Sequence, residues 1–223
     1  MPRIARAIGV GLPHHITQRG NYRQKVFNTD SDRERYLLWV AEYARKEELS
    51  VLAYCLMNNH VHFLAVPGGE GSLANAFKYA HMRYSGYFNH KHNEYGHLWQ
   101  GRFYSCVLDG QHLLAAARYI ERNPVRAGLV KIPQAWKWSS ASAHCFGGNG
   151  DFDFNLKRLW EYTGTNQSDW SRFIAEVDDP VKMADIRKYT HTGRPLGNGK
   201  MVAALEREYG RRLCALNVGR PKQ

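Results

Sequence analysis

Two short apolar runs separated by a pair of asparagines constrain the fold of this chain more than any other feature. Residues 51–57 (VLAYCLM) and 61–66 (VHFLAV) are each long enough for one buried strand. Asn58 and Asn59 between them are turn-forming residues, so the two runs are predicted to form a hairpin or a tight bend. A further strand is predicted at residues 14–19 (HHITQR), because β-branched residues there are bounded by proline and glycine.

Helical patterns lie between and after these runs. Ser31 with Glu34 forms a capping-box pattern, which predicts a helix from Ser31 as the N-cap to about Glu48. Other segments with helical spacing of apolar residues are 72–88, 110–122, 156–162, 169–177 (capped by Ser168) and 200–213. The stretches between them are read as strand material at 99–108 and as loops at 89–97 and 188–199. This order predicts an α+β protein with a mostly antiparallel sheet.

The charge of the chain is concentrated at its two ends. The 223 residues carry 31 Lys and Arg against 20 Asp and Glu, a net charge of +11. Residues 1–29 contribute +5 and residues 181–223 contribute +7, whereas residues 30–180 contribute −1. Basic ends around a neutral middle suit a polyanionic partner such as nucleic acid, although they would also serve solubility alone.

The spacing of the cysteines and the lengths of the apolar segments indicate the cellular compartment. The four cysteines are far apart and form no CxxC pair, which argues against a disulfide framework and a cysteine zinc ribbon. The first residues lack the apolar core of a signal peptide, and no segment approaches the ~20 apolar residues of a membrane span. We therefore expect a cytoplasmic, reduced protein with no membrane partner.

His60-Val61-His62 is the first group of residues that could carry chemistry. Alternate side chains of a strand share one face, so the two imidazoles would converge while Val61 points into the core. Such a pair, with added oxygen ligands, can hold a divalent ion in an open site. Leu64 stands where a two-metal hydrolase usually has an aspartate, and a chain with eleven histidines also produces such pairs by chance.

Tyr119 and Asn123 form the second group. They are four residues apart, so they lie on one face of the predicted helix, and Pro124 predicts that the helix stops or kinks at Asn123. Taken alone, the pair is equally compatible with a packed boundary tyrosine followed by a helix-terminating asparagine.

The two groups together resemble the HUH single-tyrosine transposases, and more closely the REP-associated tyrosine transposases. The resemblance extends over most of the chain. It rests on the segments HHITQRGNYRQKVF, AYCLMNNHVHFLAVP, GHLWQGRFYSCVLD, AARYIERNPVRAGLV and WKWSSASAHCFG, and more weakly on THTGRPLG.

The resemblance implies a fold and a reaction. The fold it implies is a ferredoxin-like antiparallel sheet with helices on one face. The glycine-rich stretch at 147–150 reads as a linker, so we expect the catalytic domain at 1–146 and a small, helical, basic C-terminal extension at 151–223. Tyr119 matches the nucleophile, and His60, His62 and Asn123 match the ligands of Mg²⁺ or Mn²⁺. The implied protein, a monomer or a homodimer, nicks and rejoins single-stranded DNA beside a hairpin through a 5′-phosphotyrosine.

Other residues are candidates for binding the nucleic acid. Cationic and strand-end side chains near the motifs and in the basic tail are His14, Arg19, Arg118, Arg122, Arg126, Arg194 and Arg220, with His15 as a further candidate. Aromatic side chains that could stack on bases are Trp99, Phe103 and Tyr104. Deleting residues 181–223 is then expected to weaken DNA binding while leaving the chemistry of Tyr119 possible.

Two other functions remain open from the sequence. The chain could be a non-catalytic regulator that binds DNA or RNA on the same scaffold. It could also be a metallohydrolase that uses His60 and His62, whose activity would survive the loss of Tyr119.

Overall fold

A four-stranded antiparallel sheet organises the molecule. The computed structural model describes residues 6–148 and 151–215. The strands are β1 (His14–Arg19), β2 (Leu49–Leu56), β3 (His60–Pro67) and β4 (Tyr104–Val107). They are arranged in the order β2-β3-β1-β4, and every neighbouring pair is antiparallel. The predicted α+β class, the antiparallel sheet and the hairpin at Asn58 and Asn59 are confirmed.

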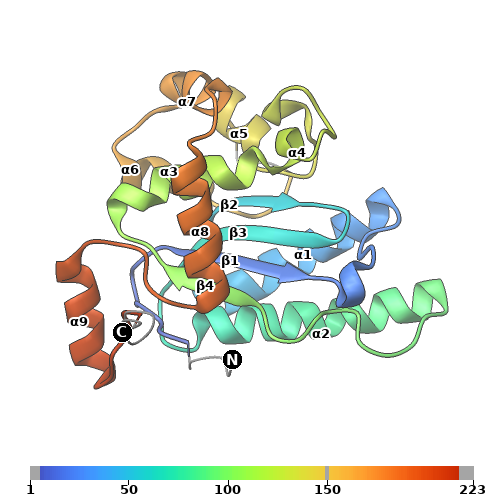
Figure 1. Ribbon diagram of the computed structural model, residues 1–223. Coiled ribbons are helices and arrows are strands. Elements are labelled where there is room, and N and C mark those ends of the chain that lie inside the picture. The colour runs from blue at the N-terminus through green and yellow to red at the C-terminus, as the bar shows by residue number, and fades with distance from the viewer. Residues whose placement is uncertain (1–5, 149–150, 216–223) are drawn as a thin grey trace, which may run out of the picture.

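The helices lie above and below this sheet (Figure 1). In chain order they are α1 (Asp30–Lys46), α2 (Ser72–His92), α3 (Gly110–Glu121), α4 (Asn123–Arg126), α5 (Ala141–Phe146), α6 (Arg158–Thr163), α7 (Gln167–Ala175), α8 (Pro180–Thr192) and α9 (Gly199–Tyr209). Within the described ranges, no helix is both long and apolar enough to cross a membrane.

Two of the predicted helix starts were wrong by a few residues. α1 is capped by Thr29 rather than Ser31: the Thr29 hydroxyl accepts from the backbone N–H of Asp32, whose carboxylate accepts in return from the N–H of Thr29. α7 is capped by Asn166 rather than Ser168. In both cases an earlier side chain already satisfies the free N–H groups of the first turn. α2 also extends through residues 89–92, which the sequence placed in a loop.

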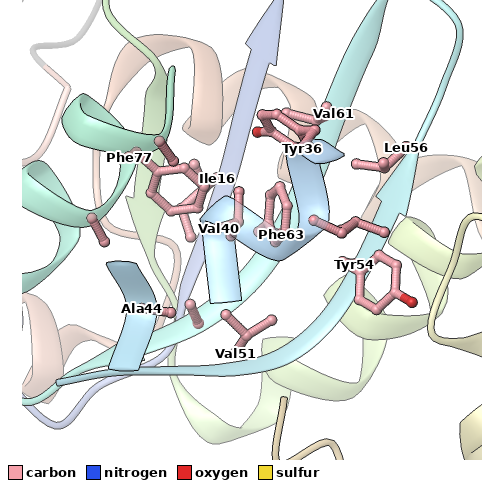
Figure 2. Packing of buried hydrophobic residues seen from close by; sticks show 14 of the residues in the cluster. Ile16, Tyr36, Val40, Ala44, Val51, Tyr54, Leu56, Val61, Phe63 and Phe77 are labelled. Atoms are coloured by element: carbon pink, nitrogen blue, oxygen red, sulfur yellow. The ribbon is translucent and has the colours of Figure 1, made fainter. Parts of the chain in front are cut away.

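One face of the sheet packs against α1 and α2. Ile16, Val61 and Phe63 from alternate strand positions point to this face and meet Tyr36 of α1 and Phe77 of α2. Figure 2 shows these side chains filling the space between the sheet and the helices. This layer is a dry aromatic and aliphatic core.

The opposite face is covered as well, by α3 and by helices of the C-terminal extension. Leu64 of β3 shares a buried cluster with Leu113 of α3, Trp170 of α7 and Ile186 of α8. The expectation of helices on one face therefore holds for α1 and α2 only. A sheet that is buried on both faces needs apolar residues at both alternating sets of strand positions. On this second face they include Leu52, Cys55 and Leu64.

α8 was not predicted, and residues 188–199 were wrongly read as one loop. Asp179 caps this helix by accepting from two backbone N–H groups, and Pro180 occupies its first turn. This Asp-Pro start is a helix signal that was present in the sequence. α8 packs against β4 and β1, and Figure 1 shows it crossing the sheet beside them.

Glu121 connects α3 to the C-terminal extension. Its fully buried carboxylate accepts hydrogen bonds from the indole of Trp170 at 2.8 Å and from the hydroxyl of Ser140, and contacts the imidazole of His144. A buried charge needs such partners. The helix that carries Tyr119 is thus held by segments on both sides of residue 150.

Candidate active site

A pocket of about 620 Å³ opens on the α3 and α8 side of the sheet, beside β1, β3 and β4. Its walls are formed by His15, Thr17, Arg19, Arg23, His60, His62, Gln100, Tyr104, Tyr119, Asn123, Arg187, Thr190 and His191. The four residues singled out as nucleophile and ligands, His60, His62, Tyr119 and Asn123, therefore line one pocket.

The strand register explains why the histidines meet there. In the β1–β3 pairing, Thr17 lies opposite His62 and Arg19 lies opposite His60, so all four side chains share one face. The rings of His60 and His62 are 5.0 Å apart between centroids. Val61, between them in sequence, points into the core on the other face.

Tyr119 reaches the same place from α3. Its side chain is 6% exposed, and its ring stands edge-on to His62 with 5.6 Å between centroids. Nε of Arg187 donates to the phenol oxygen at 3.3 Å, and the guanidinium of Arg126 lies 4.4 Å from the ring centroid. The nucleophile candidate thus lies between an imidazole pair and two cations.

The amide of Asn123 has a fixed orientation. Its Nδ2 donates to the backbone oxygens of Tyr119 at 3.0 Å and Ile120 at 3.2 Å. Because both partners are carbonyls, they must face the NH₂ group of the amide. Oδ1 accepts no hydrogen bond from any described residue, which leaves it available as a ligand.

Asn59 orients His60 in a similar way. Nδ2 of Asn59 donates to the backbone oxygen of Arg23 at 3.1 Å, and its Oδ1 lies 2.6 Å from Nδ1 of His60. An amide oxygen can only accept, so Nδ1 of His60 carries the proton. The lone pair of this imidazole is then on Nε2.

His62 belongs to a buried chain of polar groups. Its Nδ1 lies 3.0 Å from Nε2 of His15, whose Nδ1 lies 2.7 Å from the hydroxyl of Thr190. That hydroxyl is 3.2 Å from the thiol of Cys106. The chain joins β3, β1, α8 and β4.

His15, His60 and His62 are neutral at pH 7. Burial, assisted by the charge of Arg126, lowers the pKa of His15 to about 3, and burial with Arg19 nearby lowers the pKa of His60 to about 4. Burial also holds the pKa of His62 well below its usual range. A neutral imidazole is the form that binds a metal ion.

Three of the predicted DNA-binding arginines are engaged within the protein. Arg118, Arg122 and Arg126 all approach the carboxylate of Asp178, with nitrogen–oxygen distances of 4.0, 2.9 and 3.2 Å. Of the three, Arg126 also covers the ring of Tyr119. Their arrangement ties the segment before α8 to α3 and α4.

The other DNA-binding candidates are dispersed. Arg19 is exposed and lines the pocket, whereas His14 is fully buried and points to the opposite face, beside the paired Ala65. Arg194 donates to the backbone oxygen of Leu213, and Arg220 lies outside the described residues.

The aromatic candidates for base stacking separate in the same way. Trp99 and Phe103 belong to the core that α1 and α2 cover. Tyr104 lines the pocket and stacks on His191 with 4.7 Å between ring centroids.

Several residues of the pocket were not foreseen. Arg187, Thr190 and His191 come from α8, Thr17 comes from β1, and Gln100 comes from the segment between α2 and β4. For the α8 residues the available signal was the Asp-Pro helix start, which would have placed Arg187 and Thr190 on neighbouring turns of one helix.

Comparisons with known proteins agree with this geometry. Residues 10–123, which are 114 of the 223 residues, match the family described as Transposase IS200 like. No curated protein matches the chain significantly.

Two solved structures are similar to this one. The structure of a REP-associated tyrosine transposase bound to a REP hairpin matches with a TM-score of 0.51 and 20% identity, covering 63% of this chain and 82% of the other. A candidate transposase from Deinococcus radiodurans matches with a TM-score of 0.36 and 20% identity, covering 47% and 84%. The first likeness supports the fold, whereas the second is too weak to support a conclusion.

The family match spans more than half of the chain. It includes β1, the histidines of β3 and Tyr119, and it ends at Asn123. These are the residues that the fold brings into one pocket. The chain therefore belongs to the IS200-like transposase family.

Proposed function

We propose that this protein cleaves and rejoins single-stranded DNA next to a hairpin, through a covalent 5′-phosphotyrosine formed on Tyr119. The observation that carries the proposal is the position of Tyr119, whose ring lies edge-on at 5.6 Å from both His15 and His62 in one open pocket. In this arrangement Tyr119 lies beside the proposed ligands of its own chain, so we propose that it acts in cis.

The donor atoms fit a divalent cation. His60 and His62 would supply Nε2 and Asn123 would supply Oδ1, which leaves open coordination positions for oxygen atoms of a substrate. Among the described residues, no group of three His, Cys, Asp or Glu side chains is arranged to hold a metal ion, so the site depends on the amide. Two imidazoles with an oxygen ligand suit Mg²⁺ or Mn²⁺ better than a closed structural zinc site. The bound ion would polarise the scissile phosphate.

The reaction proposed for Tyr119 is a transesterification. The phenol loses its proton as the bond between its oxygen and the phosphorus forms. The bond from phosphorus to the 3′ oxygen breaks, and that oxygen takes up a proton. One phosphodiester is exchanged for another, so the reverse attack by a 3′-hydroxyl rejoins DNA without a separate energy source.

Arg187 is placed to act on the phenol oxygen itself. A guanidinium that donates a hydrogen bond to this atom stabilises the charge that develops on it, both in the attack and when it leaves in the rejoining step. Arg126, over the ring and paired with Asp178, holds the ring in place.

The mouth of the pocket suits a polyanionic strand. Arg19 and Arg23 lie at the ends of β1 and of the turn that follows, and both line the pocket with no acidic residue among its walls. The stacked pair Tyr104 and His191 offers aromatic faces to bases. The similar transposase was solved with a REP hairpin, and we propose a hairpin-flanked single strand for this chain.

Replacement of Tyr119 by phenylalanine tests the proposal. The wild type, incubated with hairpin oligonucleotides and Mg²⁺ or Mn²⁺, is expected to form a protein–DNA adduct that survives denaturing electrophoresis. Tyr119→Phe is expected to form none, because it lacks only the attacking oxygen, and Tyr162→Phe on α6 is the matched control. Adducts that persist in Tyr119→Phe would overturn the assignment. DNA binding without adducts in the wild type would favour a non-catalytic regulator.

A further inference from the structure

We propose that Thr190, acting through His15, fixes the tautomer of His62 and so keeps its Nε2 free to bind the metal ion. Both are positioning residues, and neither is a ligand. The inference rests on the proposed function, because it assigns a purpose to contacts around one proposed ligand.

The contacts are short and closed to solvent. His15 and Thr190 are 1% and 2% exposed, and His62 is 5% exposed. The two imidazoles stack with 5.2 Å between centroids and an angle of 7° between planes. Because water cannot replace the partners in such a place, each polar atom depends on its neighbour in the chain.

The chain can be protonated in two directions. In the first, Nδ1–H of His62 donates to His15, Nδ1–H of His15 donates to Thr190, and the hydroxyl of Thr190 donates to the sulfur of Cys106. In the second, every donor and acceptor is reversed, and the proton of His62 is on Nε2. Only the first direction leaves a lone pair on Nε2, where a metal ion would bind.

His60 also has a side-chain partner at Nδ1, and there the direction of the hydrogen bond is fixed. The Asn59 oxygen accepts from Nδ1 of His60, because the amide nitrogen of Asn59 is already turned to a carbonyl. Both proposed imidazole ligands are therefore held at Nδ1 by a side chain that is not itself a proposed ligand. Partners of this kind set ring orientation and tautomer, and their loss costs roughly 10–100-fold in metal affinity.

The hydrogen-bonded chain from Thr190 through His15 to His62, which we call the relay, also gives α8 a role in the site. Thr190 lies beyond the stretch that matches the family, which ends at Asn123. The C-terminal extension would then contribute to the metal affinity of the catalytic half, in addition to any contact with DNA.

The test compares Thr190→Val, which removes the hydroxyl at nearly constant shape, with Thr190→Ser, which keeps it. In the metal-free proteins, ¹⁵N correlation spectra of the histidine side chains report which ring nitrogen carries hydrogen. We expect Nδ1–H on His62 in the wild type and in Thr190→Ser, and a shift toward Nε2–H in Thr190→Val. A wild-type spectrum that shows His62 protonated on Nε2 would overturn the relay, whatever the stability of the variants.

Titration with Mn²⁺ alone provides the second readout. The dissociation constant of Thr190→Val is expected to rise roughly tenfold to 100-fold, and Thr190→Ser is expected to stay near the wild type. Equal affinity in Thr190→Val and wild type would reject the relay and leave the proposed function intact. Failure of the wild type to bind Mn²⁺ any better than His62→Ala would instead reject the proposed metal site.

Discussion

The two faces of the central sheet are formed by the same strands, but one face is packed into a core and the other borders an open pocket. On the face toward α1 and α2, Ile16, Val61 and Phe63 form a sealed core with the aromatic side chains of the helices. On the other face, the adjacent residues Thr17 and His62 line an open polar pocket. A strand with a period of two thus carries a structural sequence and a functional sequence, interleaved residue by residue.

Buried histidines occur on both faces, and only their surroundings distinguish them. Nε2 of His81 on α2 lies 3.0 Å from the hydroxyl of Tyr36, and its ring packs against Trp99 within the core. His62 is also buried, but it borders the pocket as well. A neutral imidazole in a protein is therefore a site candidate only where the packing leaves one nitrogen facing open space.

Removal of residues 180–223 is expected to have the largest effect. The truncation strips α8 from the sheet, exposes the buried cluster around Leu64 by removing Ile186 from it, and removes Arg187 and Thr190 from the pocket. We expect loss of a cooperative unfolding transition and of adduct formation, measured by calorimetry and electrophoresis. A truncated protein that still folds and forms adducts would restore the simpler expectation that this segment only grips DNA.

Adjacent substitutions on β3 should separate the two faces. Phe63→Ala is expected to cost about 3–5 kcal/mol of unfolding free energy, because it opens a cavity in the sealed core. His62→Ala should cost about 1–3 kcal/mol, through the unpaired His15, and should abolish adduct formation. Denaturant unfolding and the adduct assay measure both. Similar losses of stability for the two variants, with adducts retained in His62→Ala, would contradict the division.

The sealed face should also show in the pH dependence of stability. Burial lowers the pKa of His81 to about 3, so below pH 6.5 the unfolded chain binds a proton that the folded chain does not. The stability present above pH 6.5 is therefore lost as the pH falls toward 3, at about 1.4 kcal/mol per unit for this one group.

His81→Gln is expected to reduce that slope by this amount between pH 5.5 and 4, as measured by denaturant unfolding across the range. His90→Gln, on the exposed side of the same helix, is the matched control. An unchanged slope in His81→Gln would show that this histidine is not held neutral by the core.

The smallest effect is expected from Arg187→Gln, on the face of the sheet that borders the pocket. Its side chain is exposed, so loss of the hydrogen bond to Tyr119 should slow adduct formation roughly tenfold, or about 1.4 kcal/mol, with little change in stability. Lys188→Gln removes the same charge from the next position of α8 and serves as the control. Equal rates for Arg187→Gln and wild type would show that the contact does not act on the nucleophile.

Local patterns in the sequence were sufficient for most of the sheet and for placing two residue pairs of the proposed site, whereas the roles proposed for those pairs came from the family resemblance. Apolar runs marked β2 and β3, and the spacing of His60 with His62 and of Tyr119 with Asn123 placed each pair on one face of its element. Capping residues were less certain, because several Ser, Thr, Asp and Asn side chains compete near each helix start, as at Thr29 and Ser31.

The contribution of the C-terminal extension could not be read from the sequence. Arg118, Arg122 and Arg126 suggested phosphate contacts, and in the structure all three approach the carboxylate of Asp178, more than 50 residues later. Partners this distant depend on how segments pack, and a charged side chain gives no local sign of whether its counterion is a phosphate or a carboxylate.

By itself, then, the sequence determined the alternating pattern of the strands, the helical spacing of Tyr119 and Asn123 and the basic character of the ends, because these are set by local geometry and composition. Only the tertiary structure decided that α8 covers the second face, that Arg187 meets the phenol oxygen and that Thr190 ends a buried chain leading to His62. Those contacts join residues 47 to 175 positions apart, and such pairs form through burial of the whole sheet, which no local pattern encodes.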